Sequence, residues 1–220
     1  MTRPTPAADA AAIDAILARA PALPVIAIER LEDAVPLARA LVAGGLPVLE
    51  ITLRTPVALD AIRAIRAALP EALVGAGTVL DGAALAAVQA AGAAFAIAPG
   101  CTDALYAATR TCALPFLPAV ATASELMRGL EHDFRRFKFF PAEAAGGIAA
   151  LRAFAGPFPQ ARFCPTGGID ATNAPRYLAL PNVATIGGSW MLPADAIAAR
   201  DWDRIETLAR EAAALRLGRG

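Results

Sequence analysis

Short apolar runs alternate with longer amphipathic stretches along nearly the whole chain. The apolar runs recur about every 20 to 25 residues, which is typical of units in which a parallel strand is followed by a helix. The eight expected strands are Pro24–Glu29, Pro47–Leu53, Leu73–Gly77, Ala94–Pro99, Phe116–Val120, Phe137–Phe140, Arg162–Thr166 and Val183–Gly187. Eight such units predict the α/β class and a (β/α)8 TIM barrel that occupies residues 1–220 as a single domain.

The segments between these strands carry the apolar stripes expected of helices. Ile62, Ile65 and Leu69 recur at helical spacing. We expect their helix to begin with Thr55 as its N-cap and Pro56 in its first turn.

Other helix boundaries follow from similar signals. Asp81 is expected to cap the next helix, residues 202–215 form an amphipathic stripe, and residues 7–20 predict an extra N-terminal helix. An open doubly wound sheet would also alternate strands and helices. Residues 75–80, however, lack the third glycine of a dinucleotide-binding fingerprint, which favours the barrel.

The composition excludes several classes of function. The chain has 220 residues, 57% of them apolar, and its 20 basic and 20 acidic residues leave no net charge. Without a basic stripe, we expect neither nucleic acid nor a membrane surface as a partner. A single histidine excludes a histidine-based triad or a His-rich metal site. Cys101, Cys112 and Cys164 form no zinc pattern and suit a reducing compartment, so we expect a cytoplasmic location.

Lys138 is the only lysine among the twenty basic residues, and it lies in an otherwise apolar run, Phe137–Pro141. Burial disfavours the charged form of an amine, and a neutral amine is a nucleophile toward carbonyl carbon. Lys138 is therefore the first candidate for covalent chemistry. A lysine on an edge strand, or one that extends its ammonium to water, is the alternative that this run leaves open.

Three polar residues alternate with apolar ones at the end of the second expected strand: Glu50, Thr52 and Arg54. Successive side chains of a strand point to opposite faces, so these three share one face. In a barrel the active site is built at the carboxyl ends of the strands. The pattern predicts a functional site, and a structural ion pair between Glu50 and an arginine is the alternative.

Polar residues and two glycine pairs follow other strands at the same end. They are Thr78 after the third strand, Thr166, Gly167 and Gly168 after the seventh, and Gly187, Gly188 and Ser189 after the eighth. Glycine has no Cβ, so its backbone N–H groups can close on phosphate oxygens. Phosphate sites recur after the last two strands of barrels, which predicts one here, although each glycine pair alone also fits a tight turn. Glu143 is expected to be structural, in the first turn of the helix after the sixth strand.

Six runs in the right order, spread over nearly the whole chain, closely resemble the bacterial 2-keto-3-deoxy-6-phosphogluconate (KDPG) aldolases, the KHG/KDPG aldolase family. The lysine-bearing FKFFPAE and the glutamate-bearing LEITLRT are specific to that family. The runs are LARALVAGGLPVLEITLRTP, VGAGTVL, FAIAPG, FKFFPAE, FCPTGGI and IGGSWM.

The resemblance implies a (β/α)8 homotrimer that needs neither a metal ion nor a cofactor. It implies reversible cleavage of 2-dehydro-3-deoxy-6-phospho-gluconate to pyruvate and glyceraldehyde 3-phosphate, with Lys138 as the Schiff-base lysine and Glu50 as the general acid/base. We expect burial and Arg54 to favour the neutral amine over the ammonium that pairing with Glu50 would favour. The other implied roles are carboxylate binding by Arg54 and Thr78, a pocket wall at Phe140, and phosphate binding by Gly167, Gly168 and Ser189.

Three other functions remain open on the same scaffold. The first keeps the imine chemistry but acts on 4-hydroxy-2-oxoglutarate or on the galactonate-series substrate. The second is an isomerase that works by acid/base chemistry without a covalent lysine, and the third is a non-catalytic phosphosugar-binding protein. Ala119 bears on the first, because relatives carry glycine there and the extra methyl group narrows the floor of the site.

Overall fold

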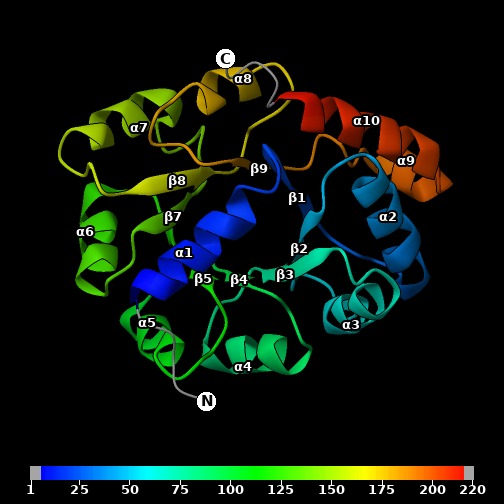
Figure 1. Ribbon diagram of the computed structural model, residues 1–220, viewed down its shortest axis with the longest axis horizontal. Helices are drawn as coiled ribbons and strands as arrows, with labels where there is room; N and C mark the ends of the chain where they lie inside the picture. Colours follow the sequence, from blue (N-terminus) through cyan, green and yellow to red (C-terminus); the bar gives the residue numbers. More distant parts are fainter. Residues whose placement is uncertain (1–5, 216–220) are drawn as a thin grey trace.

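The computed structural model describes residues 6–215, in which helices surround a strongly curled parallel sheet (Figure 1). The strands are β1 (Ala22–Ile26), β2 (Val48–Thr52), β3 (Leu73–Gly77), β4 (Ala96–Ile97), β5 (Phe116–Leu117), β6 (Ala119–Val120), β7 (Arg136–Phe139), β8 (Arg162–Pro165) and β9 (Ile186–Gly188). They form a six-stranded part in the order β5-β4-β3-β2-β1-β9 and a three-stranded part in the order β6-β7-β8. The strand pairings described above are parallel, so the α/β class and the parallel sheet are confirmed.

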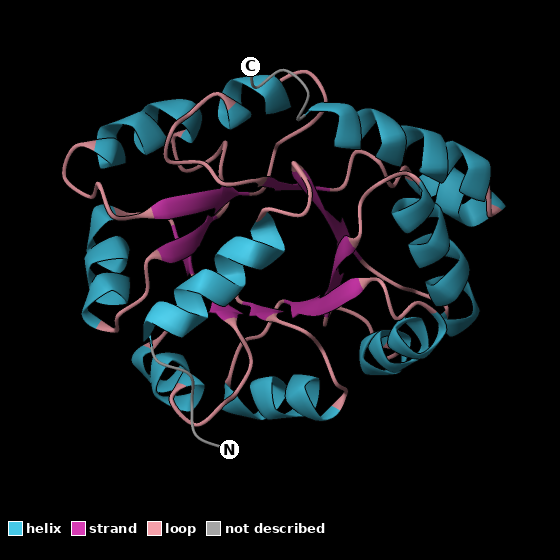
Figure 2. Cartoon of the chain, in the orientation of Figure 1, coloured by secondary structure: helices cyan, strands magenta, loops and turns pink. Residues whose placement is uncertain are grey.

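Helices cover the outer face and one end of this sheet (Figure 2). They are α1 (Pro6–Leu17), α2 (Leu31–Ala43), α3 (Ala58–Ala68), α4 (Gly82–Ala90), α5 (Asp103–Thr109), α6 (Ala123–Glu131), α7 (Gly147–Ala155), α8 (Ala174–Leu178), α9 (Ala194–Ala199) and α10 (Trp202–Ala214). The expected N-terminal and C-terminal helices are confirmed as α1 and α10. Asp81 caps α4 as expected, because its carboxylate accepts a hydrogen bond from the N–H of Ala84 (2.8 Å). Within residues 6–215, no helix has the length and apolarity needed to cross a membrane.

The predicted start of α3 is wrong. The helix begins at Ala58, and its N-cap is Val57. The hydroxyl of Thr55 donates to the backbone carbonyl of Ile28 instead (2.6 Å), so it ties the loop after β2 to the end of β1. The Thr55 hydroxyl therefore bonds to a residue distant in the sequence, and it does not cap the helix as the local spacing predicted.

The expected fifth strand is interrupted at Pro118. Phe116–Leu117 pairs with β4 and Ala119–Val120 pairs with β7. The expected strand is therefore divided into two short strands, β5 and β6. Proline has no N–H to continue a ladder, but its carbonyl still accepts from the N–H of Lys138 (2.9 Å). Closure of the sheet into one eight-stranded barrel stays a prediction.

Three further strands differ from their expected ranges. The first lies at Ala22–Ile26 instead of Pro24–Glu29. The fourth is shortened to Ala96–Ile97, and the eighth lies at Ile186–Gly188, with Val183 in an isolated bridge to Phe163. A second isolated bridge joins Thr166 to Gly187 and brings the ends of β8 and β9 together.

Side-chain alternation along the strands creates two apolar layers. Leu49 and Ile51 of β2 belong to the large cluster between sheet and helices, whereas Val48 belongs to a second cluster inside the curl of the sheet. Helix α1 lies across one end of the curled sheet (Figure 1). Its buried residues Ile13, Ile16 and Leu17 pack into that inner cluster, and α1 therefore closes the end opposite the carboxyl ends of the strands. The other members of the inner cluster are Leu23, Phe95, Ile97, Leu117 and Cys164.

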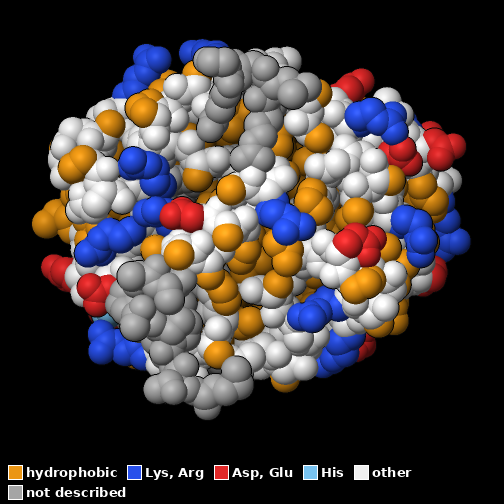
Figure 3. Space-filling view, viewed as in Figure 1, with side chains coloured by type: hydrophobic (Ala, Val, Ile, Leu, Met, Phe, Trp, Pro, Cys, Tyr) orange, Lys and Arg blue, Asp and Glu red, His pale blue; other side chains and the backbone are white. Residues whose placement is uncertain are grey.

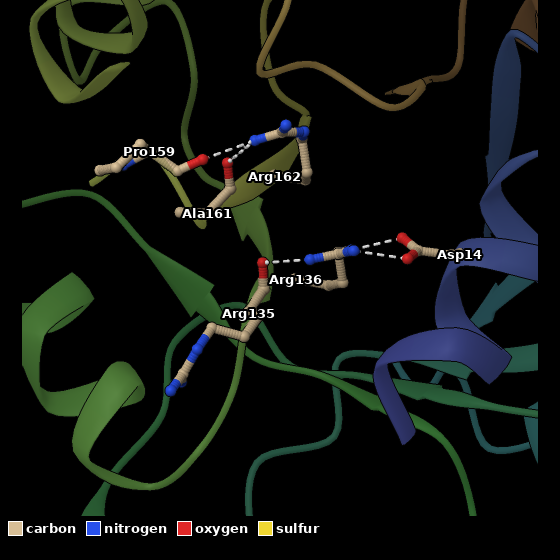
Figure 4. Close-up of polar contacts among 6 residues, drawn as sticks. All are labelled: Asp14, Arg135, Arg136, Pro159, Ala161 and Arg162. Carbon is tan, nitrogen blue, oxygen red and sulfur yellow. Dashed lines mark hydrogen bonds and ion pairs between the residues drawn. The ribbon is translucent and has the colours of Figure 1, made fainter. Parts of the chain in front are cut away.

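An ion pair fastens α1 to the sheet. The guanidinium of Arg136 on β7 donates through Nε and Nη2 to both carboxylate oxygens of Asp14, a two-pronged contact (Figure 4). Arg162 on β8 donates to the carbonyls of Pro159 and Ala161 nearby. On this face of the molecule, acidic and basic side chains are dispersed around apolar ones (Figure 3), without the basic stripe that nucleic-acid binding would need.

Candidate active site

Lys138 and Glu50 meet inside the curled sheet. The Nζ of Lys138, on β7, donates to the Oε1 of Glu50, on β2, over 2.9 Å. Lys138 is 5% exposed and Glu50 is 1% exposed. Strand β7 lies between β6 and β8, so Lys138 is neither on an edge strand nor extended to water. The partner of Glu50 is this lysine and not an arginine, so the structural alternatives weighed for both residues are wrong.

The second carboxylate oxygen of Glu50 is also buried. Its Oε2 accepts no hydrogen bond from any group in residues 6–215. A buried carboxylate oxygen without a donor is costly unless a ligand or water supplies one. One oxygen of Glu50 therefore holds the amine, and the other can accept a proton or hydrogen bond from a bound molecule.

Phe140 extends this inner site beyond the end of β7. The Nζ of Lys138 lies 5.5 Å from the centre of the Phe140 ring. Phe140 is half-buried. On the neighbouring strand β6, Ala119 is the register partner of Lys138. The alanine methyl group, where relatives are expected to carry glycine, therefore lies on the strand next to Lys138.

Gly77 is a site residue that the sequence analysis missed. A Cβ on Gly77 would lie 2.2 Å from Oε1 and 2.7 Å from Cγ of Glu50, closer than any real contact. Gly75 leaves similar room for the ring of Phe95, which fills the interior. The Gly-x-Gly spacing at the end of β3 was a possible signal, because glycine inside a strand often marks a close approach.

A methyl group at position 77 should therefore displace the carboxylate. We expect Gly77→Ala to lower kcat by about 10²-fold, the effect typical of a misplacement of about 1 Å at a reacting group. Gly100→Ala is the matched control, since a Cβ there meets nothing within 4 Å. Steady-state kinetics of both variants check the prediction, and equal activities would show that Gly77 has no such role.

Thr52 links Arg54 to the sheet. The Thr52 hydroxyl donates to the carbonyl of Ile26 (2.8 Å) and accepts from the Nε of Arg54 (3.0 Å). Arg54 is exposed and retains further N–H donors. No hydrogen bond or ion pair within residues 6–215 joins Arg54 to Lys138 or Glu50, and the expected effect of Arg54 on the amine stays a prediction.

Thr78 follows β3 in an unusual conformation. Its φ is 61°, in the left-handed region that a β-branched residue rarely adopts. Such backbone costs about 1–3 kcal/mol and is found mostly at functional sites. Thr78 is half-buried, so its side chain remains accessible to a bound molecule.

The two glycine pairs lie next to each other. The bridge between Thr166 and Gly187 joins the loops that follow β8 and β9. Gly167 and Gly168 have φ values of 101° and 75°, which only glycine adopts readily. Within residues 6–215, the N–H groups of Gly168 and Ser189 donate to no acceptor. Free N–H groups in left-handed backbone form a concave anion-binding surface.

Close packing also explains two glycines of the last strand. A Cβ on Gly187 would lie 2.2 Å from the hydroxyl oxygen of Thr166, and one on Gly188 would lie 2.0 Å from the ring of Trp190. The sequence-predicted residues thus fall into two groups, an inner one around Lys138 and an outer one of glycine loops.

The described part of the chain offers no group of three or more His, Cys, Asp or Glu side chains suited to a metal ion. Cys164 is a free thiol and the register partner of Lys138 on β8. Burial raises the pKa of Cys164 to about 12, an effect that nearby Lys138 only partly offsets. Cys164 therefore remains a neutral apolar neighbour of the amine.

The chain is similar to known proteins over most of its length. A family model described as KDPG and KHG aldolase matches residues 13–208. The KHG/KDPG aldolase of Escherichia coli (strain K12) is 58% identical over 199 residues, which cover 90% of this chain and 93% of that protein.

Solved structures are similar over the same length. The KDPG aldolase of Legionella pneumophila, with pyruvate captured at low pH as a covalent carbinolamine intermediate, has a TM-score of 0.89 and 51% identity, covering 91% of this chain and 97% of that one. The enzyme of Zymomonas mobilis ZM4 with 3-phosphoglycerate has a TM-score of 0.86 and 49% identity, covering 92% and 95%. The chain belongs to the KDPG and KHG aldolase family.

Proposed function

We propose that the chain is a class I aldolase that reversibly cleaves 2-dehydro-3-deoxy-6-phospho-D-gluconate to pyruvate and D-glyceraldehyde 3-phosphate. The observation that carries the proposal is the buried contact between Lys138 and Glu50 (2.9 Å). The covalent carbinolamine of pyruvate in the Legionella enzyme supports an amine nucleophile in this family.

The pair can supply a neutral amine without outside help. A proton that passes from the ammonium of Lys138 to Oε1 of Glu50 leaves an amine and a carboxylic acid, and no charge is buried. The amine attacks C2 of the ketoacid to form a carbinolamine. Glu50 then returns the proton to the departing hydroxyl, water leaves, and an iminium joins Lys138 to the substrate.

Cleavage follows from the iminium, which withdraws electrons from C3. The Glu50 carboxylate takes the proton of the C4 hydroxyl as the C3–C4 bond breaks, and the electron pair of that bond enters the enamine. The aldehyde departs, and Glu50 returns its proton to C3. Water hydrolyses the resulting pyruvyl imine and restores the amine of Lys138.

The remaining site residues are proposed to bind and orient. Arg54 and Thr78 would hold the substrate carboxylate, with a two-pronged contact from the guanidinium, and Phe140 would line the pocket. Phosphate would be bound by the loops after β8 and β9, which the free N–H groups support. The proposed phosphate-binding residues are Thr166, Gly167, Gly168, Gly187, Gly188 and Ser189. The 3-phosphoglycerate present with the Zymomonas enzyme supports a phosphorylated ligand in this family.

Reduction with borohydride tests the covalent step. Treatment of the protein with pyruvate and borohydride is expected to add one reduced pyruvyl group, and peptide mass spectrometry should locate it on Lys138. An acid/base isomerase or a non-catalytic sugar-phosphate-binding protein would gain no mass. Absence of an adduct on the folded wild-type protein would refute the proposed aldolase mechanism.

A different substrate on the same scaffold is the second candidate. The Escherichia coli relative is a KHG/KDPG aldolase, and Ala119 is the register partner of Lys138 on the neighbouring strand. Values of kcat/KM for the phosphorylated gluconate, its galactonate epimer and 4-hydroxy-2-oxoglutarate separate these substrates. A preference for the unphosphorylated acid would count against the phosphate-binding loops.

We also propose the finer architecture that the resemblance implies. If β5 and β6 count as one strand bent at Pro118, the sheet has eight strands, and the bridge between Thr166 and Gly187 supports closure into a barrel. A single domain over residues 1–220 and a homotrimer are part of the same proposal, and light scattering of the purified protein measures the second. Residues 1–5 and 216–220 lie outside the described part of the chain. A cytoplasmic location stays a prediction.

A further inference from the structure

The loops that follow β7 and β8 run side by side. The N–H of Ala142 donates to the carbonyl of Thr166 (2.8 Å), and the N–H of Glu143 donates to the carbonyl of Gly167 (3.1 Å). These two bonds hold the carbonyl sides of the glycine loop, while the N–H group of Gly168 donates to no acceptor in residues 6–215. The orientation of these peptide groups therefore depends on the loop that contains Glu143.

Glu143 also contacts this loop through its side chain. A Cβ on Gly168 would lie 2.7 Å from Cγ and 2.8 Å from Cβ of Glu143, so the stem of the glutamate lies directly against the glycine. The residue precedes α7, which begins at Gly147, and the expectation that it lies in the first turn of that helix is wrong. Its position is set by the neighbouring loop and not by the helix.

A buried tyrosine holds the carboxylate of Glu143. The hydroxyl of Tyr177, in α8, donates to Oε1 of Glu143, and Tyr177 is 0% exposed. Burial, followed by this hydrogen bond, raises the pKa of Tyr177 above its ordinary value, so the hydroxyl remains a donor. Gly147 has φ 55° and leaves room for the contact, since a Cβ there would lie 2.9 Å from the hydroxyl oxygen.

Asn173 anchors the other end of the glycine loop. Its Nδ2 donates to the carbonyl of Gly168 (2.9 Å), and its Oδ1 accepts from the N–H of Asp170 (3.0 Å). Asn173 immediately precedes α8, the helix that contains Tyr177. The loop is therefore held at two points, and Glu143 is the connection to the strand that carries Lys138.

We propose that Glu143 and Tyr177 are positioning residues that keep the Gly167–Gly168 loop in its phosphate-binding conformation. The inference rests on the proposed function, because it takes that loop as the phosphate site. Neither residue acts on the reacting carbon atoms. Their loss should weaken binding of the phosphate end of a substrate and leave imine chemistry at Lys138 unchanged.

Removal of the tyrosine hydroxyl tests this division. In the condensation with pyruvate, Tyr177→Phe is expected to raise KM for glyceraldehyde 3-phosphate about tenfold, the size of a lost hydrogen bond to a charged group. KM for unphosphorylated D-glyceraldehyde and kcat for both aldehydes should change less than about twofold, because these do not depend on phosphate. The inhibition constant of inorganic phosphate should rise together with KM for glyceraldehyde 3-phosphate.

Three further variants separate positioning from general packing. Tyr106→Phe, which removes the hydroxyl of another buried tyrosine, should leave the ratio of the two KM values unchanged. Glu143→Gln keeps an acceptor oxygen and should retain most of the affinity, whereas Glu143→Ala, which also removes the stem packed against Gly168, should raise KM for glyceraldehyde 3-phosphate at least as much as Tyr177→Phe. The double variant Tyr177→Phe/Glu143→Ala should be no worse than the more severe single one, because both changes break one contact.

The outcomes distinguish this inference from the proposed function. Equal changes in KM for both aldehydes, or no change for either, would overturn the positioning role and leave the aldolase assignment intact. A wild-type protein without preference for the phosphorylated aldehyde would overturn the phosphate site and the inference with it. If Tyr177→Phe fails to fold by circular dichroism, Glu143→Ala, at an exposed position, decides the question by the same measurements.

Discussion

Replacement of Lys138 by alanine is expected to abolish imine formation with pyruvate and to lower kcat/KM on the order of 10⁴-fold or more, as expected for loss of a nucleophile. No other lysine is present in the chain to take over the role. Borohydride trapping followed by mass spectrometry measures the first effect, and steady-state cleavage assays measure the second. A Lys138→Ala protein that still traps pyruvate would refute the assignment.

Alanine also leaves Glu50 buried without its partner. Breaking a buried ion pair from one side typically costs about 3–5 kcal/mol, so the stability of Lys138→Ala must be measured by urea unfolding. Lys138→Arg is the matched variant. It keeps a positive charge opposite Glu50 but cannot form an imine, so it should fold and remain inactive. An active Lys138→Arg protein would contradict covalent catalysis.

Glu50→Gln should separate imine formation from turnover. Glutamine keeps the shape of the side chain but cannot take up the proton of the C4 hydroxyl, so kcat is expected to fall by about 10²–10⁴-fold. The amine of Lys138 no longer faces a carboxylate, which removes the interaction that favours its ammonium form. Some adduct with pyruvate should therefore still be trapped in single-turnover experiments.

A buried acid outside the site provides the control for this variant. Asp33, in α2, is buried and forms ion pairs with Arg30 (2.7 Å) and Arg200 (2.8 Å). Asp33→Asn should lower the free energy of unfolding, but it should reduce kcat much less than Glu50→Gln does. A Glu50→Gln enzyme with kcat close to that of the wild type would show that another group transfers the protons.

The order of strands and helices could be predicted from the sequence because the pattern of apolar residues is local. The stripe over residues 202–215 gave α10, and Asp81 marked the start of α4. Boundaries failed where a distant group intervened. Thr55 bonds to Ile28 across β1 and β2 and does not cap α3, and Pro118 divides a continuous apolar run between two neighbouring strands.

Candidate site residues were partly predictable from composition and alternation. Lys138 stood out as the only lysine, and Glu50 shares a face with Thr52 because side chains alternate along a strand. Their contact could not be derived in this way, since the two residues are 88 positions apart. The role of Gly77 also depends on a carboxylate from a neighbouring strand, and Glu143 was assigned to a helix that begins four residues later.

Residue types and their periodicity, which act over a few neighbouring positions, thus determined the α/β class, the succession of elements and the nucleophile candidate. Only the tertiary structure decided that Lys138 meets Glu50 and that Tyr177 holds Glu143 against the glycine loop. The physical reason is the distance along the sequence over which each effect acts. Propensity and side-chain alternation are properties of adjacent residues, whereas a hydrogen bond between two strands or helices exists only after the sheet has curled and brought them together.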